Sequence, residues 1–256
     1  MLPEAQPPAP SEPAPEPPAV ERAPPERYPF WSYTDVALFF ALAVPALLIG
    51  WLAVKGFFAV TGIHMAARAA EPLVQQLVGY GILFAALMLI FRVQYDRPFW
   101  QSLAWRPVRM PFGLIMMFGL LTAFAVALLG TLIQAPNTEN TITEMMRDRT
   151  SLVLVMIFGT TFGPVCEELA FRGFLQPVLV RSMGPVAGIM MAAIPFGLLH
   201  YQEYGNSWRH VVILSASGAA FGWMRHRTGS TKAAALMHAS FNALAFAAVI
   251  AQRTIG

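Results

Sequence analysis

The stretch TFGPVCEELAFRG, residues 161–173, places two adjacent glutamates inside a segment that is otherwise apolar enough to span a membrane. A charged side chain at the centre of a bilayer costs at least about 2.5 to 3.5 kcal/mol on insertion scales, so such a side chain usually serves a function. Glu167 and Glu168 therefore predict a functional site within a membrane helix. A purely structural ion pair with Arg172 is the simpler alternative.

The composition of the whole chain is that of a polytopic membrane protein. Apolar residues make up 56% of its 256 residues and charged residues only 12%, and the mean hydropathy is +0.54. Soluble domains carry about twice that share of charged residues. We expect the lipid bilayer to surround the protein. A net charge of +3 gives no sign of nucleic-acid binding, and we expect no such partner.

Seven apolar stretches are candidates for membrane-spanning helices, each of which needs about 20 apolar residues. They predict an all-α, polytopic membrane helical bundle of about seven transmembrane helices, with six to eight as the range. The stretches are residues 36–54, 73–91, 112–133, 151–180, 185–200, 210–224 and 233–251. Pro45, Pro164 and Pro195 lie inside or near them and should kink the helices, which membrane bundles tolerate.

The chain divides into a tail and a membrane domain. Residues 1–34 are rich in Pro and Glu and lack the basic start and apolar core of a signal peptide, so they predict a disordered cytoplasmic tail. Residues 35–256 form the predicted transmembrane domain, with a motif-bearing core at about 150–250. An inside N-terminus gives the inner loops about twice as many basic residues as the outer loops, which predicts a multi-pass protein of the cell inner membrane with a cytoplasmic N-terminus and an outer C-terminus.

The two glutamates have different predicted tasks. Glu168 and Arg172 are four residues apart, so they share a helix face and can pair. Glu167 points about 100° away and is the carboxylate left to face a cavity and accept a proton. The neighbouring Cys166 is the single cysteine of the chain; it is read as a packing residue because no histidine lies near it in sequence.

Two further polar patterns lie within later apolar stretches. They are Phe196-x-x-x-His200 and His238-x-x-x-Asn242, both at helical spacing. His238 and Asn242 align on one face, where they could jointly donate hydrogen bonds to an oxyanion. A carboxylate pair, an arginine and two histidines on three predicted helices are the inventory of a water-activating site.

Together the three motifs resemble the CPBP family of intramembrane proteases, also called the CAAX protease and bacteriocin-processing or Abi family. The family pattern of Glu-Glu-x-x-x-Arg, Phe-x-x-x-His and His-x-x-x-Asn occurs here in the same order, within roughly residues 150–250. The resemblance implies an intramembrane endopeptidase in which Glu167 is the general base and His200 positions the water. His238 and Asn242 would stabilise the tetrahedral intermediate.

The resemblance also implies a supporting pair and a substrate class. Glu168 and Arg172 would be the supporting pair, and the substrate would be a peptide or protein at the membrane, with prenylated CAAX termini as one class. Participation of a metal is left open by the sequence. Glu167, His200 and His238 could supply three ligands to a divalent metal such as zinc and leave the fourth position to water.

Two other functions fit parts of the sequence. A catalytically silent scaffold or immunity protein of the same fold would not need its catalytic residues, and here all of them are intact. A proton-coupled transporter could use Glu167 and Glu168 as a relay. Many such transporters contain duplicated halves, and this chain shows no internal repeat.

The predicted depths of the site residues disagree with one another. Glu167 lies ~24 Å from the outer end of its predicted helix, His200 ~22 Å from the inner end of its own, and His238 only ~8 Å from the inner end. Helices that are shifted and kinked, or late segments that do not all span the bilayer, would remove the disagreement.

Overall fold

The computed structural model describes residues 27–136 and 144–255, and the regular structure of these residues is entirely helical. The predicted all-α bundle is confirmed, and each of the seven predicted stretches falls on a helix or on a series of helices. In chain order the elements are α1 (Tyr33–Thr61), α2 (Ala70–Tyr95), α3 (Phe99–Ser102), α4 (Phe112–Leu132), α6 (Arg149–Thr160), α7 (Phe162–Glu168), the π-helix η1 (Leu169–Leu175), α8 (Gln176–Met183), α9 (Pro185–Leu199), α10 (Trp208–Thr228) and α11 (Thr231–Ile255).

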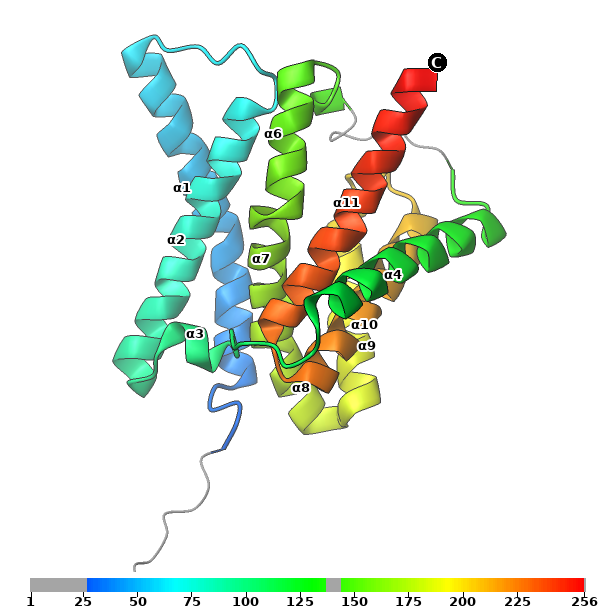
Figure 1. Ribbon diagram of the computed structural model, residues 1–256. Helices are drawn as coiled ribbons and strands as arrows, with labels where there is room; N and C mark the ends of the chain where they lie inside the picture. Colours follow the sequence, from blue (N-terminus) through cyan, green and yellow to red (C-terminus); the bar gives the residue numbers. More distant parts are fainter. Residues whose placement is uncertain (1–26, 137–143, 256) are drawn as a thin grey trace, which may run out of the picture.

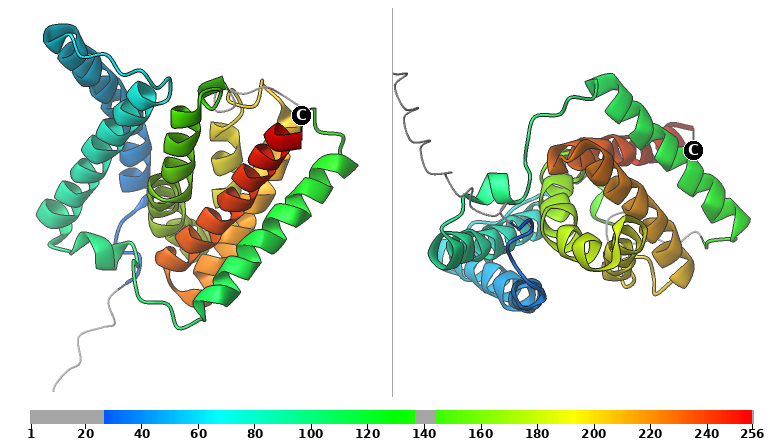
Figure 2. Two further views of the ribbon diagram at one scale, coloured as in Figure 1. Left: turned by 45° about the horizontal axis from the view of Figure 1, so that its top comes forward. Right: turned by 90° about the horizontal axis from the view of Figure 1, so that it is seen from below.

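The helices form a two-helix wing beside a rounder bundle (Figure 1). α1 and α2 pack against each other on one side of the molecule. The elements from α6 to α11 form the bundle, and α4 lies along the outer face of α11 (Figure 2). The three motifs therefore lie on elements of one bundle.

Five helical stretches are long and apolar enough to cross a membrane: Tyr33–Thr61, Ala70–Tyr95, Phe112–Leu132, Arg149–Met183 and Thr231–Ala251. α10 is not among them. α9 is apolar but has only 15 residues, which span about 22 Å, less than the ~30 Å hydrocarbon core. The C-terminal end of α9 therefore lies at an intermediate depth if its other end is near a membrane surface.

The stretch Arg149–Met183 explains the disagreement between the predicted depths. Its 35 residues would extend about 52 Å, so its two ends cannot both mark the edges of the hydrocarbon core. The stretch is also interrupted. Thr161, with φ −128° and ψ −84°, separates α6 from α7, Pro164 lies in the first turn of α7, and a π-helix follows. Pro45 and Pro195 lie inside α1 and α9.

The segment before α1 is packed against the bundle. Residues 1–26 of the predicted tail lie outside the described residues, but Trp31 is fully buried, and its indole Nε1 donates a hydrogen bond of 3.0 Å to the Phe174 carbonyl. The two rings stack with centroids 5.4 Å apart. Arg181 donates to the carbonyls of Pro29 and Trp31. The packed core thus includes residues before position 35.

α4 approaches α11 at a glycine. A Cβ atom at Gly119 would overlap the Ser240 hydroxyl and the Met237 carbonyl, and the second of these is backbone that cannot rotate away. Close contact through small residues is a common way for membrane helices to associate, since apolar side chains gain little by leaving lipid.

Replacing this glycine should loosen the contact. We expect Gly119→Ala to destabilise the protein by about 1–3 kcal/mol through overpacking, measured as a lower thermal unfolding midpoint in detergent. Gly113→Ala on the same helix is the control. A Cβ at Gly113 meets nothing within 4 Å, and alanine favours a helix more than glycine does. Equal midpoints for the two variants would show that the close approach does not hold α4 in place.

Candidate active site

A buried ion pair lies at the centre of the bundle, where α7 passes into η1. The Arg172 Nη1 atom donates to Glu168 Oε1 at 3.0 Å, and both side chains are 0% exposed. The predicted pairing of these residues is therefore present, and the π-helical turn carries the arginine. π-Helical turns are rare and frequently occur at functional sites.

The Arg172 guanidinium is fixed by contacts from other elements. Its Nη2 atom donates to the Gly218 carbonyl of α10 at 2.7 Å, and its Cζ lies 4.4 Å from the centroid of the Phe196 ring on α9. A Cβ at Gly218 would come within 2.9 Å of Nη2, so the arginine needs a glycine there. Gly218 is not predicted by the sequence, because a lone glycine in a helix gives no sign of the distant side chain that it accommodates.

His238 brings α11 to the two glutamates. Its Nδ1 atom lies 3.0 Å from Glu168 Oε1, and its Nε2 atom lies 3.9 Å from Glu167 Oε2. The imidazole stacks on Phe221, with centroids 4.5 Å apart and planes at 18°. Because an ionised Glu168 can only accept, Nδ1 carries the hydrogen, and Nε2 is the nitrogen that lies nearer Glu167.

Glu167 differs from its neighbour in its surroundings. Its side chain is 24% exposed, whereas Glu168 is fully buried. Tyr80 of α2 and Glu203, in the turn after α9, lie close enough to Glu167 to interact with it electrostatically. Burial raises the pKa of Glu203; His200 opposes this rise and Glu167 adds to it. Two adjacent carboxylates are thus separated into one that is enclosed and one that is accessible.

Tyr80 and Glu203 are two further residues of the site that the motifs do not predict. Glu203 follows His200 by three residues, so a helical or turn-like continuation of that motif would have indicated it. Tyr80 carries no comparable signal, since it lies on α2 and approaches the site only when the wing packs beside the bundle.

His200 and Asn242 lie at the edges of this network. The His200 Nδ1 atom lies 2.9 Å from the Phe196 carbonyl, which can only accept, so Nδ1 carries the hydrogen and Nε2 is an acceptor in the neutral ring. His200 is half-buried, and the centroid of its ring lies 5.2 Å from that of the Phe196 ring. The Asn242 amide nitrogen donates to the Gly159 carbonyl of α6 at 2.7 Å, which uses one of its two hydrogens.

The predicted metal ligands do not form a three-ligand site in this arrangement. Within residues 27–136 and 144–255, no three or more His, Cys, Asp or Glu side chains are grouped so that they could hold a metal ion. Glu167 and His238 are close enough to share an ion, but a catalytic zinc normally has three protein ligands.

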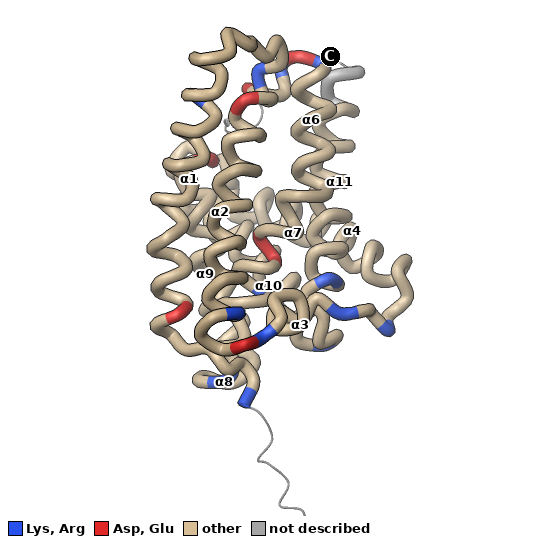
Figure 3. The backbone as a smooth tube through the Cα atoms, turned by 90° about the vertical axis from the view of Figure 1, so that its left-hand side faces the viewer, with Lys and Arg blue, Asp and Glu red and all other residues tan. Residues whose placement is uncertain are grey.

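The five spanning helices and the buried network define an integral, multi-pass membrane protein with a polar site inside its helical bundle. In Figure 3 the acidic positions of α7 lie about halfway along the bundle, away from the charges at its two ends. Burial at that depth is costly without a compensating partner, and Arg172 and His238 are the partners.

Residues 149–244 match the model of the family described as Type II CAAX prenyl endopeptidase Rce1-like. The matched segment runs from α6 into α11 and holds all six predicted site residues. This match confirms the resemblance to the CPBP family, and it supports a peptide-hydrolase activity for the segment because the matched family is one of proteases. No curated protein and no solved structure is significantly similar to the chain.

Removing the arginine should leave an uncompensated buried charge. We expect Arg172→Leu to destabilise the protein by about 3–5 kcal/mol, the usual cost of breaking a buried pair, as measured by unfolding in detergent. Arg92→Leu is the control, because Arg92 and Asp96 form another i,i+4 pair with side chains 75% and 84% exposed. It should change stability by no more than about 0.5 kcal/mol. Similar losses for both variants would contradict a special role for the buried pair.

Proposed function

We propose that this protein is an intramembrane endopeptidase that hydrolyses a peptide bond near the membrane surface with a water molecule activated by Glu167. One observation carries the proposal. Of two adjacent carboxylates, Glu168 is fully buried and neutralised by Arg172, whereas Glu167 is partly exposed. An accessible carboxylate beside a fixed, neutralised one is the arrangement of a general base with its support.

The proposed reaction begins with transfer of a proton from water to a Glu167 carboxylate oxygen. The resulting hydroxide attacks the carbonyl carbon of the peptide, and the carbonyl oxygen becomes an oxyanion. The proton on Glu167 then passes to the leaving nitrogen as the C–N bond breaks, which returns Glu167 to its ionised form. Glu168 takes no proton in this sequence, because Arg172 and His238 both hold its Oε1 atom.

His238 and Asn242 are the proposed stabilisers of the oxyanion. Nδ1 of His238 is held by Glu168, so its Nε2 atom, when protonated, is the donor directed toward the reacting atoms. Asn242 lies one turn further along α11 and has a second amide hydrogen besides the one donated to Gly159. Donors held in advance by other bonds stabilise a developing charge without reorganisation.

His200 is the proposed residue that positions the water. Its Nδ1–H is held by the Phe196 carbonyl, so its Nε2 can accept a hydrogen bond from water. Glu203 interacts electrostatically with both His200 and Glu167, which places the turn after α9 beside the same carboxylate. We infer that this turn and Tyr80 bound the site on the side away from Arg172.

The substrate that we propose is a peptide or protein segment at the membrane, with a prenylated CAAX terminus as the first class to test. A site within a bilayer favours substrates that partition into lipid, and a prenyl chain does so.

The location that we propose is the cell inner membrane, with a cytoplasmic N-terminus; the excess of basic residues in the predicted inner loops supports this orientation.

Cleavage by the purified full-length protein in detergent tests the enzyme proposal. We expect activity on at least one member of a panel of prenylated and unprenylated peptides. Glu167→Gln and His200→Ala should each reduce kcat/KM by at least about 100-fold, the usual contribution of general acid–base groups. Cys166→Ala is the matched control beside Glu167, and it should retain activity because no step uses the thiol.

Other outcomes would favour the alternative functions. Cleavage that Glu167→Gln leaves intact would refute the assigned base. No cleavage by any equally well-folded protein would favour a catalytically silent scaffold or immunity protein. Proton flux in liposomes that Glu167→Gln abolishes, without peptide cleavage, would favour a proton-coupled transporter.

Metal removal gives a separate test of the chemistry. Because the described side chains offer no three-ligand site, we expect cleavage to survive dialysis against a chelator of divalent metals. The measurement is kcat/KM before and after dialysis, with zinc added back. Loss of activity that zinc restores would show that Glu167, His200 and His238 rearrange around a metal ion.

A further inference from the structure

A pocket lies at the end of the bundle that holds the N-terminal segment, and neither glutamate of the candidate active site lines it. It has a volume of about 740 Å³, and four arginines line it: Arg27, Arg97, Arg106 and Arg225. No acidic side chain of the described residues lines this basic pocket. Such a lining is complementary to an anion.

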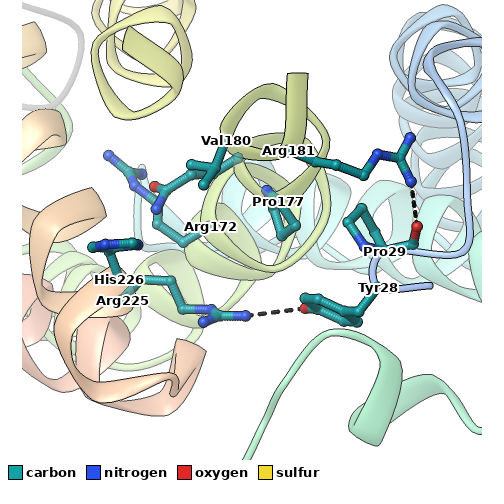
Figure 4. A pocket seen from close by; sticks show the side chains of 9 residues that line it. Tyr28, Pro29, Arg172, Pro177, Val180, Arg181, Arg225 and His226 are labelled. Atoms are coloured by element: carbon teal, nitrogen blue, oxygen red, sulfur yellow. Dashed lines mark hydrogen bonds between the residues drawn. The ribbon is translucent and has the colours of Figure 1, made fainter. Parts of the chain in front are cut away.

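The wall of the basic pocket is held in place by a continuous hydrogen-bond network. Arg225 is only 8% exposed; its Nη2 donates to the Tyr28 hydroxyl and its Nε to Thr231 Oγ1, both at 3.0 Å. The Tyr28 hydroxyl in turn donates to the Ser102 carbonyl at 3.3 Å. Figure 4 shows the Arg225–Tyr28 bond from the side of an adjoining cavity that the same two residues line.

The start of α11 fixes the loop that carries Arg106. The Thr231 amide donates to the Ala104 carbonyl at 3.0 Å and its hydroxyl to the Leu103 carbonyl at 2.6 Å. Ser230 Oγ donates to the Arg106 carbonyl at 2.8 Å. These hydrogen bonds fix the backbone of the loop, while the Arg106 side chain stays exposed. The pocket is therefore preorganised for a ligand.

The basic pocket has exposed aromatic residues beside it. Trp100, in α3 beside the pocket, is 49% exposed, and the centroids of its ring and the Trp105 ring are 5.8 Å apart. Exposed tryptophans gather at the headgroup level of a bilayer, and pockets of Arg and Lys between helix ends bind phosphorylated headgroups. Arginine is well suited to phosphate, because its planar donors bind two oxygens at once.

We propose that the basic pocket binds the phosphate group of an anionic ligand, and that the headgroup of an anionic phospholipid supplies it. The volume is of the size of a small-molecule site and admits such a headgroup. The proposal does not rest on the proposed peptidase function, because none of the four arginines takes part in the reaction. The protein would thereby select its lipid surroundings at this end of the bundle.

Lipid binding by the purified full-length protein in neutral detergent tests this proposal. Native mass spectrometry would measure the affinity for phosphatidylglycerol and for phosphatidylcholine. We expect phosphatidylglycerol to bind more tightly and Arg106→Gln to weaken its binding by about fivefold, the factor expected for one arginine near a charged surface. Arg109→Gln is the control, since Arg109 is exposed on the same connection but does not line the pocket, and it should change the affinity less than twofold.

Inorganic phosphate distinguishes the two sources of the anion. If millimolar phosphate displaces phosphatidylglycerol from the native protein but not from Arg106→Gln, the phosphate group suffices and a soluble phosphate ester is also a ligand. If phosphate displaces no phosphatidylglycerol from the native protein, the acyl chains contribute to binding and the ligand is a lipid. Equal binding of the two lipids, or equal effects of Arg106→Gln and Arg109→Gln, would overturn the proposal. So would Arg106-dependent capture of an acidic peptide by a protein that does not bind phosphatidylglycerol.

Discussion

The buried contact between Glu168 and Arg172 is the constraint on which the rest of the structure depends. Neither charge could remain at this depth alone, because hydrocarbon and packed side chains offer no solvation. The arginine is therefore enclosed by the Gly218 carbonyl and by the face of Phe196, and the glutamate by His238. These contacts come from α9, α10 and α11, so one ion pair determines how three further helices are placed around η1.

The same constraint separates two carboxylates that are adjacent in sequence. A helix turns about 100° per residue, so a pair of glutamates cannot both face the arginine. Glu168 takes the buried position, and Glu167 is left near the edge of the network, beside Glu203 and Tyr80. Different environments for two chemically identical groups are a general way to give them different roles. The proposed base, Glu167, is thus the glutamate that does not pair with Arg172.

The two ends of the motif-bearing bundle differ in character. At the end of the N-terminal segment, Tyr28 and Arg225 line the basic pocket, and hydrogen bonds link Arg225 to Tyr28 and to Thr231. On the other side of the ion pair, the short α9 ends in the turn that brings Glu203 toward Glu167. The buried pair lies between the basic pocket and Glu167, the proposed base. The proposed lipid binding and the proposed chemistry therefore use different residues.

The sequence by itself determined the helical class, the positions of the seven apolar stretches and the pairing of Glu168 with Arg172. These follow from local rules, since apolar length and i,i+4 spacing act within one helix. Only the tertiary structure decided that His238 reaches Glu168 across 70 residues of sequence, that Asn242 donates to Gly159, and that four arginines line one pocket. The depth of each helix and its contacts with neighbours depend on packing, on the break at Thr161 and on a membrane stretch longer than the bilayer requires. None of these is encoded by the spacing of residues along a single helix.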